Sequence, residues 1–118
     1  MLIRVDPQST VPLFAQIADA LRADITGGRL SAGERLPSAR EVAEALQVNL
    51  HTVLHAYQDL RDEGLVDLRR GRGAVVTPAG AALAGLQAEI VALVDKARSL
   101  NVSPDTLSAL VKEAARDR

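Results

Sequence analysis

The sequence predicts a mainly α-helical fold with one small β-hairpin, followed by two further helices at the C-terminal end. Three observations lead to this prediction. Three segments before residue 64 repeat apolar residues at helical spacing. Two short segments with strand-like patterns then flank a turn rich in arginine and glycine. Because only 2% of the residues are aromatic, the core must come from aliphatic side chains, which suits packed helices.

The composition limits the classes of protein that fit. A chain of 118 residues has no room for a second large catalytic or ligand-binding domain. The absence of cysteine excludes disulfides and thiolate metal sites and favours a reducing cytoplasm. The N-terminus lacks the apolar run of a signal peptide, and we expect no segment to approach the length of a membrane span and no membrane partner. The net charge of −1 means that any surface for nucleic acid must carry its positive charge locally.

The first helix follows a short extended arm at residues 1–9. Pro12 is predicted to lie in the first turn of this helix, where a missing N–H costs little, and the pair at residues 27–28, both glycine, ends it. The apolar residues of the arm are Leu2, Ile3 and Val5. The predicted inward face of the helix consists of Leu13, Ile17, Ala20, Leu21 and Ile25.

Two more helices are predicted close together. Ser38 opens the second helix and has the spacing of a capping box with Glu41, and the helix stops near Gln47. Asn49 is the expected N-cap of a third, longer helix that runs to Glu63. Two short helices joined by a tight turn are typical of a helix-turn-helix. The residues predicted to face the core are Ala39, Val42, Ala43 and Leu46, then Val53, Ala56, Tyr57 and Leu60.

The segment after the third helix reads as a β-hairpin. Residues 65–69 form the first predicted strand, residues 70–73 the turn, and residues 74–77 the second strand. Three arginines lie at or beside the turn, which makes it the densest positive patch in the chain: Arg69, Arg70 and Arg72. A hairpin in this position is the wing of a winged helix-turn-helix domain, which we place at residues 11–79, with the helix-turn-helix at about 38–63 and the wing at 65–77.

Pro78 and Gly80 are expected to mark the boundary of a second unit at residues 80–118. Its first helix has an apolar stripe, and Ser103 caps a final short helix with Pro104 at its first position. The first domain is too small to cover both helices, so we expect them to pair with a second copy, the alternative being that they fold back on their own domain. The apolar residues are Leu83, Leu86, Ile90, Leu93, Val94, Ala97 and Leu100, then Leu107, Leu110 and Val111.

The candidate functional residues lie at the ends of these elements. A recognition helix presents polar side chains near its N-terminus, because that end enters the major groove of DNA. Arginines on a wing can bind phosphate or the minor groove, although they also occur on solvated turns. Ser38 can bind phosphate or serve only as a cap. The DNA-binding residues predicted from these patterns are Ser38, Asn49, Leu50, His51, Thr52, His55, Arg70, Gly71 and Arg72.

Residues 11–77 resemble the DNA-binding domain of the GntR family. The short helical tail resembles that of the YtrA-like subfamily, whose members carry only a small dimerisation region. The resemblance implies a transcriptional repressor without enzymatic activity that binds a two-fold DNA operator as a homodimer through residues 80–118. It also implies that Arg40 is a DNA-binding residue and that a small-molecule effector releases the protein from DNA. The matching residues are Leu36, Pro37, Ser38, Arg40, Glu41, Ala43, Asn49, Thr52, Val53, Ala56, Tyr57, Leu60, Glu63, Gly64, Leu65 and the run at 70–73.

Two features of the third helix need separate interpretation. Many members of the family carry arginine or another polar residue where this chain has Leu50 and Leu54. An exposed leucine can touch a thymine methyl group, or it can pack against the second helix or the wing. His51, His55 and Asp59 follow one another at intervals of four, a spacing that can hold zinc. Because the histidines fall on the expected DNA face, we expect no metal and no cofactor.

Other classes of function have less support in the sequence. The acidic net charge favours a winged-helix module that binds proteins without binding DNA, whereas Arg40 and the wing arginines favour DNA. An enzyme is not expected, because no nucleophile–base pair or phosphate-binding loop occurs. The chain can also be one domain of a longer regulator, but the capped last helix and charged end at Arg118 favour a natural terminus.

Overall fold

The computed structural model describes residues 3–117, which form two compact units. The first unit ends at Gly85 and the second begins at Leu86. Leu2 of the predicted arm and the terminal Arg118 lie outside the described residues. The first unit thus extends beyond residue 79, where the boundary was expected.

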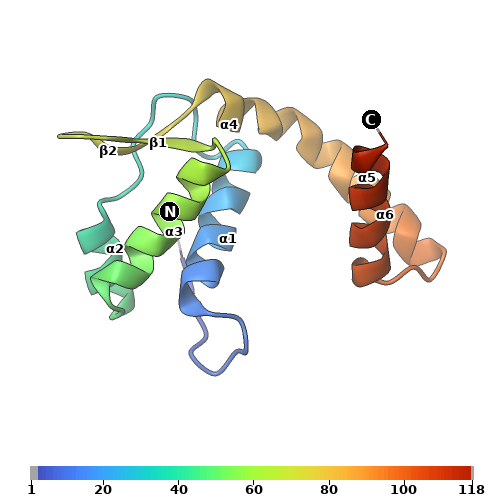
Figure 1. The fold of residues 1–118 in the computed structure, drawn as a ribbon, viewed down its shortest axis with the longest axis horizontal. Coiled ribbons are helices and arrows are strands. Elements are labelled where there is room, and N and C mark those ends of the chain that lie inside the picture. The colour runs from blue at the N-terminus through green and yellow to red at the C-terminus, as the bar shows by residue number, and fades with distance from the viewer. Residues whose placement is uncertain (1–2, 118) are drawn as a thin grey trace. The chain divides into compact units, whose positions relative to one another are not determined.

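The first unit begins with the helices α1 (Leu13–Thr26), α2 (Ala39–Leu46) and α3 (Leu50–Asp62). Figure 1 shows α1 alongside α3, with α2 next to the N-terminal half of α3. The apolar stripe predicted for α3 is confirmed, because all four of its residues are buried. Burial of an aliphatic side chain stabilises the fold by ~1.5–3 kcal/mol. The buried residues of α1 and α3 are Ile17, Ala18, Leu21, Ile25, Val53, Ala56, Tyr57 and Leu60.

The helix ends follow the predicted capping residues with two differences. The Asn49 side chain accepts a hydrogen bond from the His51 N–H (2.8 Å), and the Ser38 side chain accepts one from the Glu41 N–H (3.1 Å). Only this half of the predicted capping box forms in the described residues, because no bond returns from Glu41 to the Ser38 N–H. Pro12 precedes α1 as its N-cap rather than lying inside the first turn.

The wing is built from β1 (Val66–Arg69) and β2 (Gly73–Val76), which pair antiparallel with Val66 opposite Val76. This confirms the predicted hairpin to within one residue at the outer ends. The loop before α2 pairs with the other edge of β2, a contact that the sequence did not predict. The Leu36 N–H donates to the carbonyl of Ala74 (2.8 Å), and the Val76 N–H donates to the carbonyl of Glu34 (2.9 Å). The wing is therefore tied to the segment that leads into α2.

A short helix, α4 (Pro78–Ala82), takes the place of the predicted boundary. The Thr77 side chain caps it by accepting from the Gly80 N–H (2.8 Å), and α4 packs against α1. Gly80 is buried, and a Cβ atom there would lie 2.6 Å from the Leu65 carbonyl oxygen. The missing side chain therefore allows α4 to lie close to the start of the wing. This close packing explains why the first unit continues past residues 78–80.

A 3₁₀ turn, η1 (Leu83–Leu86), leads into the second unit, which consists of α5 (Gln87–Ser99) and α6 (Pro104–Arg116). The helix predicted to begin near Leu83 therefore begins at Gln87. The Ser103 side chain caps α6 by accepting from the Thr106 N–H (3.2 Å), as predicted. Among the described residues of this unit, Ala97 alone is buried. The large apolar side chains that remain exposed are Leu86, Ile90, Val91, Leu93, Leu100, Leu110 and Val111.

One stretch has the length and composition of a membrane-spanning helix. It runs from Pro78 to Ser99 and reaches a mean hydropathy of 1.2 over 18 residues, so the expectation that no segment approaches this length is wrong. Length and composition do not distinguish a spanning helix from one that pairs with another protein helix. Glu89 and Asp95 lie within the stretch, and carboxylates are costly in a bilayer.

Candidate nucleic-acid interface

The N-terminal end of α3 presents a set of side chains that do not belong to the core. Leu50 and His51 are exposed and Thr52 is half-buried, directly after the capping residue Asn49. The first backbone N–H groups of a helix carry partial positive charge, which attracts anions such as phosphate. This end of α3 thus combines a favourable field with side chains that are free to contact a partner.

The start of α2 is held in a fixed position beside α3. The Tyr57 hydroxyl donates a hydrogen bond to the carbonyl of Pro37, directly before the cap residue Ser38. Burial raises the pKa of the Tyr57 phenol, so it keeps its proton and remains a donor. Ser38 accepts the capping bond, which leaves its hydroxyl hydrogen available to donate to a phosphate. Arg40 lies in the first turn of α2 and is exposed.

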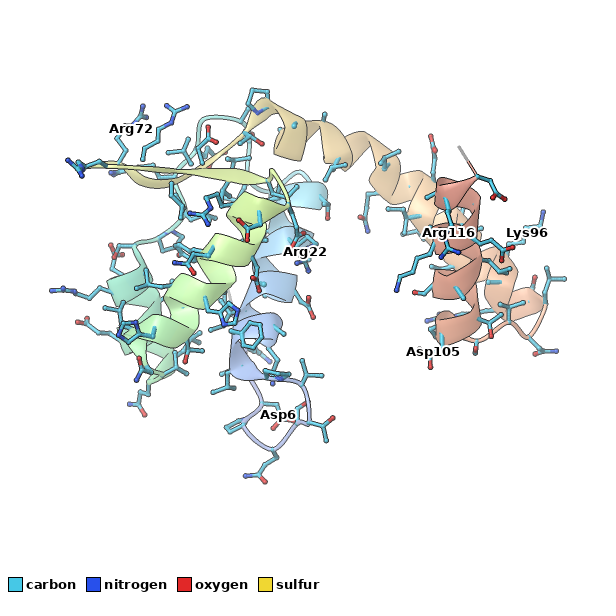
Figure 2. All side chains as sticks on the ribbon, in the orientation of Figure 1. Asp6, Arg22, Arg72, Lys96, Asp105 and Arg116 are labelled. Carbon is cyan, nitrogen blue, oxygen red and sulfur yellow. The ribbon has the colours of Figure 1, made fainter. Side chains whose placement is uncertain are left out.

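The turn of the wing carries Arg70, Gly71 and Arg72, all exposed. Figure 2 shows Arg72 projecting from the hairpin. Gly71 and Gly73 have φ values of 81° and 77°, a left-handed conformation that favours glycine, so their first role is to make the turn. Residues of the wing turn and of the start of α2 line the same groove, which measures about 620 Å³. The predicted site residues that line it are Ser38, Gly71 and Arg72.

The arginines of the first unit fall into two groups. Arg22 bonds both oxygens of the Glu63 carboxylate (2.7 and 2.6 Å), and Arg29 bonds Asp24 (2.7 Å). Within the described part of the chain, by contrast, Arg40, Arg70 and Arg72 form no ion pair. Their charges are therefore not neutralised inside the protein and remain available to phosphate.

His55, which is predicted to lie on the DNA face with His51, is exposed and also contacts α1. Its ring stacks on Phe14 of α1, with centroids 3.7 Å apart and planes within 9°. Its Nε2 atom lies 3.7 Å from an Asp59 carboxylate oxygen. The His55 ring therefore helps to join α1 to α3. Among residues 3–117, no group of three or more side chains is placed to hold a metal ion.

A second groove, which the sequence did not predict, lies between α3, the start of α2 and the wing and measures about 430 Å³. Its walls are largely apolar, and two exposed leucines contribute to them, Leu54 from α3 and Leu68 from β1. Leu68 shares the inward face of β1 with buried Val66, and this alternation was the available signal in the sequence. The other lining residues are Ser38, Ala39, Tyr57, Gln58, Arg69, Arg70, Gly73 and Ala74.

Comparison with known structures finds the same architecture in DNA-binding regulators. YtrA from Sulfolobus acidocaldarius, a GntR-family transcription factor, superposes with a TM-score of 0.62 at 33% identity, covering 84% of this chain and 99% of that one. The DNA-binding domain of AraR, solved in complex with operator ORX1, superposes with a TM-score of 0.57 at 26% identity. That match covers 63% of this chain and 92% of the AraR chain.

Comparison of sequences gives the same family. The repressor YtrA of Bacillus subtilis (strain 168) is 36% identical over 76 residues, which cover 64% of this chain and 58% of the relative. The chain thus matches less than two thirds of that repressor's length. Residues 13–76 match the sequence profile of the bacterial regulatory proteins of the gntR family, which is more than half of the chain. The chain therefore belongs to the GntR family of transcription regulators and resembles the YtrA proteins within it.

Proposed function

We propose that this protein is a transcriptional repressor that binds a two-fold DNA operator as a homodimer. The observation that carries the proposal is a set of exposed arginines at the start of α2 and on the wing that form no ion pair within residues 3–117: Arg40, Arg70 and Arg72. The AraR complexes support operator DNA as the partner, and the name of the Bacillus relative supports repression. A regulator of this kind would act in the cytoplasm, on the chromosome.

Each part of the interface has a distinct role in this proposal. The N-terminal turn of α3 enters the major groove, where Leu50, His51 and Thr52 face the base edges. Ser38 and Arg40 bind the phosphate backbone beside it. Arg70 and Arg72 on the wing bind phosphates or the adjacent minor groove. Asn49 and Gly71 set the backbone geometry that presents these side chains, and His55 holds α3 against α1.

The second unit is the proposed dimerisation device. Seven large apolar side chains of this unit are exposed, Leu86, Ile90, Val91, Leu93, Leu100, Leu110 and Val111. A cleft between α5 and α6 adds further apolar surface. Burial of such side chains stabilises an interface by ~1.5–3 kcal/mol each before the costs of association. A second copy of the same two helices is the partner that two-fold symmetry supplies.

Selection of bound sequences from random duplex DNA tests the proposal. The expected result is an inverted repeat whose half-sites are about one helical turn apart, ~10 bp. Sedimentation should give a dimer at micromolar concentration, and the selected operator should silence a reporter promoter when the protein is expressed. Failure to enrich any motif would refute DNA regulation and favour a protein-binding module. A motif without two-fold symmetry would refute the symmetric dimer alone.

A further inference from the structure

We propose that Leu50 and Leu54 read the C5-methyl groups of thymine, so that the operator has A·T pairs where α3 enters the major groove. This inference rests on the proposed function, because it requires α3 to lie in that groove. It assigns the specificity of the site to apolar contact rather than to hydrogen bonds from arginine.

The first observation is the distribution of leucines in the first unit. Most leucines that the structure describes in α1 to α4, in the wing and in the loops between them are buried or half-buried. The exceptions are Leu50, Leu54 and Leu68, which are 37%, 36% and 40% exposed. All three lie on α3 or on the wing, which are the elements of the candidate interface. Exposed leucines are thus concentrated at this surface.

The second observation is that these side chains share one face. Leu50 and Leu54 are four residues apart on α3, so they lie on the same side of the helix. Leu54 and Leu68 line the same groove below the wing. Leu46 and Val48, just before α3, are half-buried and pack against the core, whereas Leu50 and Leu54 keep more than a third of their surface exposed. Packing within the protein therefore leaves part of each leucine of α3 open to a partner.

The surroundings of this apolar face fit DNA. Arg69 and Arg70 lie along the groove, and Arg40 lies in the neighbouring first turn of α2. Apolar side chains rimmed by arginines match a DNA major groove, in which base edges lie between two charged phosphate strands. Arg69 is paired with Asp67 (3.5 Å), but a purely apolar protein partner would leave Arg40 and Arg70 without counter-charges among the described residues.

The chemistry of the base edges selects thymine. In the major groove thymine presents a methyl group, guanine presents two acceptors and cytosine presents an amino donor. A leucine can neither donate to guanine nor accept from cytosine, so contact with either would strip water from a polar group without replacing its hydrogen bond. Contact with the thymine methyl removes only apolar surface from water.

Replacing thymine by uracil on the selected operator tests the inference, because it removes the methyl group and keeps every hydrogen-bonding group. Each uracil at a position facing Leu50 or Leu54 should weaken binding about fourfold, the value of one buried methyl group. At the position that faces Leu50, L50A should bind the uracil and thymine operators equally. L54A should do the same at the position that faces Leu54. The matched control is V11A, which shortens an exposed apolar side chain ahead of α1 and should keep the full preference for thymine.

The outcomes separate this inference from the function on which it rests. A specific operator that binds equally well with uracil at every position, or that has G·C pairs where α3 enters, would overturn the methyl readout and leave the regulator intact. If no motif is selected, both the methyl readout and the proposed DNA-binding function are refuted. Thermal unfolding of each variant checks that it is folded, and the uracil scan on the unaltered protein decides the question without any variant.

Discussion

Replacing Gly80 by alanine should destabilise the first unit. A Cβ atom at this position would lie 2.6 Å from the Leu65 carbonyl oxygen and 3.2 Å from both the Leu65 Cα and the Thr77 hydroxyl oxygen. Two of these three atoms belong to the backbone. Cβ atoms essentially never come within 3.0 Å of a heavy atom from a residue that is not a neighbour in the chain, so α4 or the start of the wing must move by about 0.4 Å.

The size of the effect follows from three contributions. Forcing a methyl group into a packed site costs ~1–3 kcal/mol. A shift of α4 also weakens the cap between Thr77 and the Gly80 N–H, which contributes ~1 kcal/mol. The higher helix propensity of alanine offsets ~1 kcal/mol of this loss in stability. The net loss is therefore roughly 1–3 kcal/mol, and each kcal/mol should lower Tm by ~4–8 °C in a domain of this size.

Gly85→Ala is the matched control. A Cβ at Gly85 meets no atom within 4 Å, and its φ is not in the left-handed region, so the substitution should be neutral or stabilise by ~0.4–1 kcal/mol. Urea unfolding of the full chain, followed by circular dichroism, measures both variants. If G80A is as stable as G85A, α4 does not pack closely against Leu65, and the first unit does not need residues 78–82.

Two further outcomes test the same unit. Tyr57→Phe removes the hydrogen bond to Pro37 and should cost ~0.5–1.5 kcal/mol at neutral pH. Because burial raises the folded-state pKa of Tyr57 above the ordinary value of 10.0, the unaltered protein should lose stability as pH rises past about 10, and Y57F should lack that loss in pH-dependent unfolding. A fragment that ends at Gly85 should unfold cooperatively, whereas one that ends at Thr77 lacks Ala81 and Leu83, which pack against the core, and should melt several degrees lower.

The helices and the wing could be predicted because local rules fix them. Each buried stripe repeats at helical spacing, and Ser38, Asn49 and Ser103 cap as their residue types favour. The extent of the first unit could not be predicted, because proline and glycine, as at positions 78 and 80, are also common at domain boundaries. Only the close approach of Gly80 to Leu65, which lies on the other side of the hairpin in sequence, shows that this glycine is a packing residue.

The site residues were predictable in position but not always in direction. Arg70 and Arg72 lie at the tip of the wing, as the turn signal indicated, and His51 lies exposed in the first turn of α3. The stacking of His55 on Phe14 could not be predicted, because the place of Phe14 beside α3 is a tertiary contact. The pairing of the loop at 34–36 with β2 is likewise a long-range contact without a local pattern.

The salt dependence of binding tests whether the wing contacts the DNA backbone. The chain has a net charge of −1, yet Arg70 and Arg72 form no ion pair with the described residues, so binding must rely on few, local phosphate contacts. The slope of log affinity against log salt is negative, and each lost contact should make it less negative by about one, so R70A/R72A should reduce its magnitude by about two if both arginines bind phosphate. R29A is the control, because Arg29 is already paired with Asp24 and its loss should leave the slope unchanged.

Titrations of operator DNA between about 50 and about 200 mM salt measure the slopes of the unaltered protein and both variants. If the double variant keeps the full slope and affinity, the wing does not contact the backbone, and its arginines belong to a solvated turn.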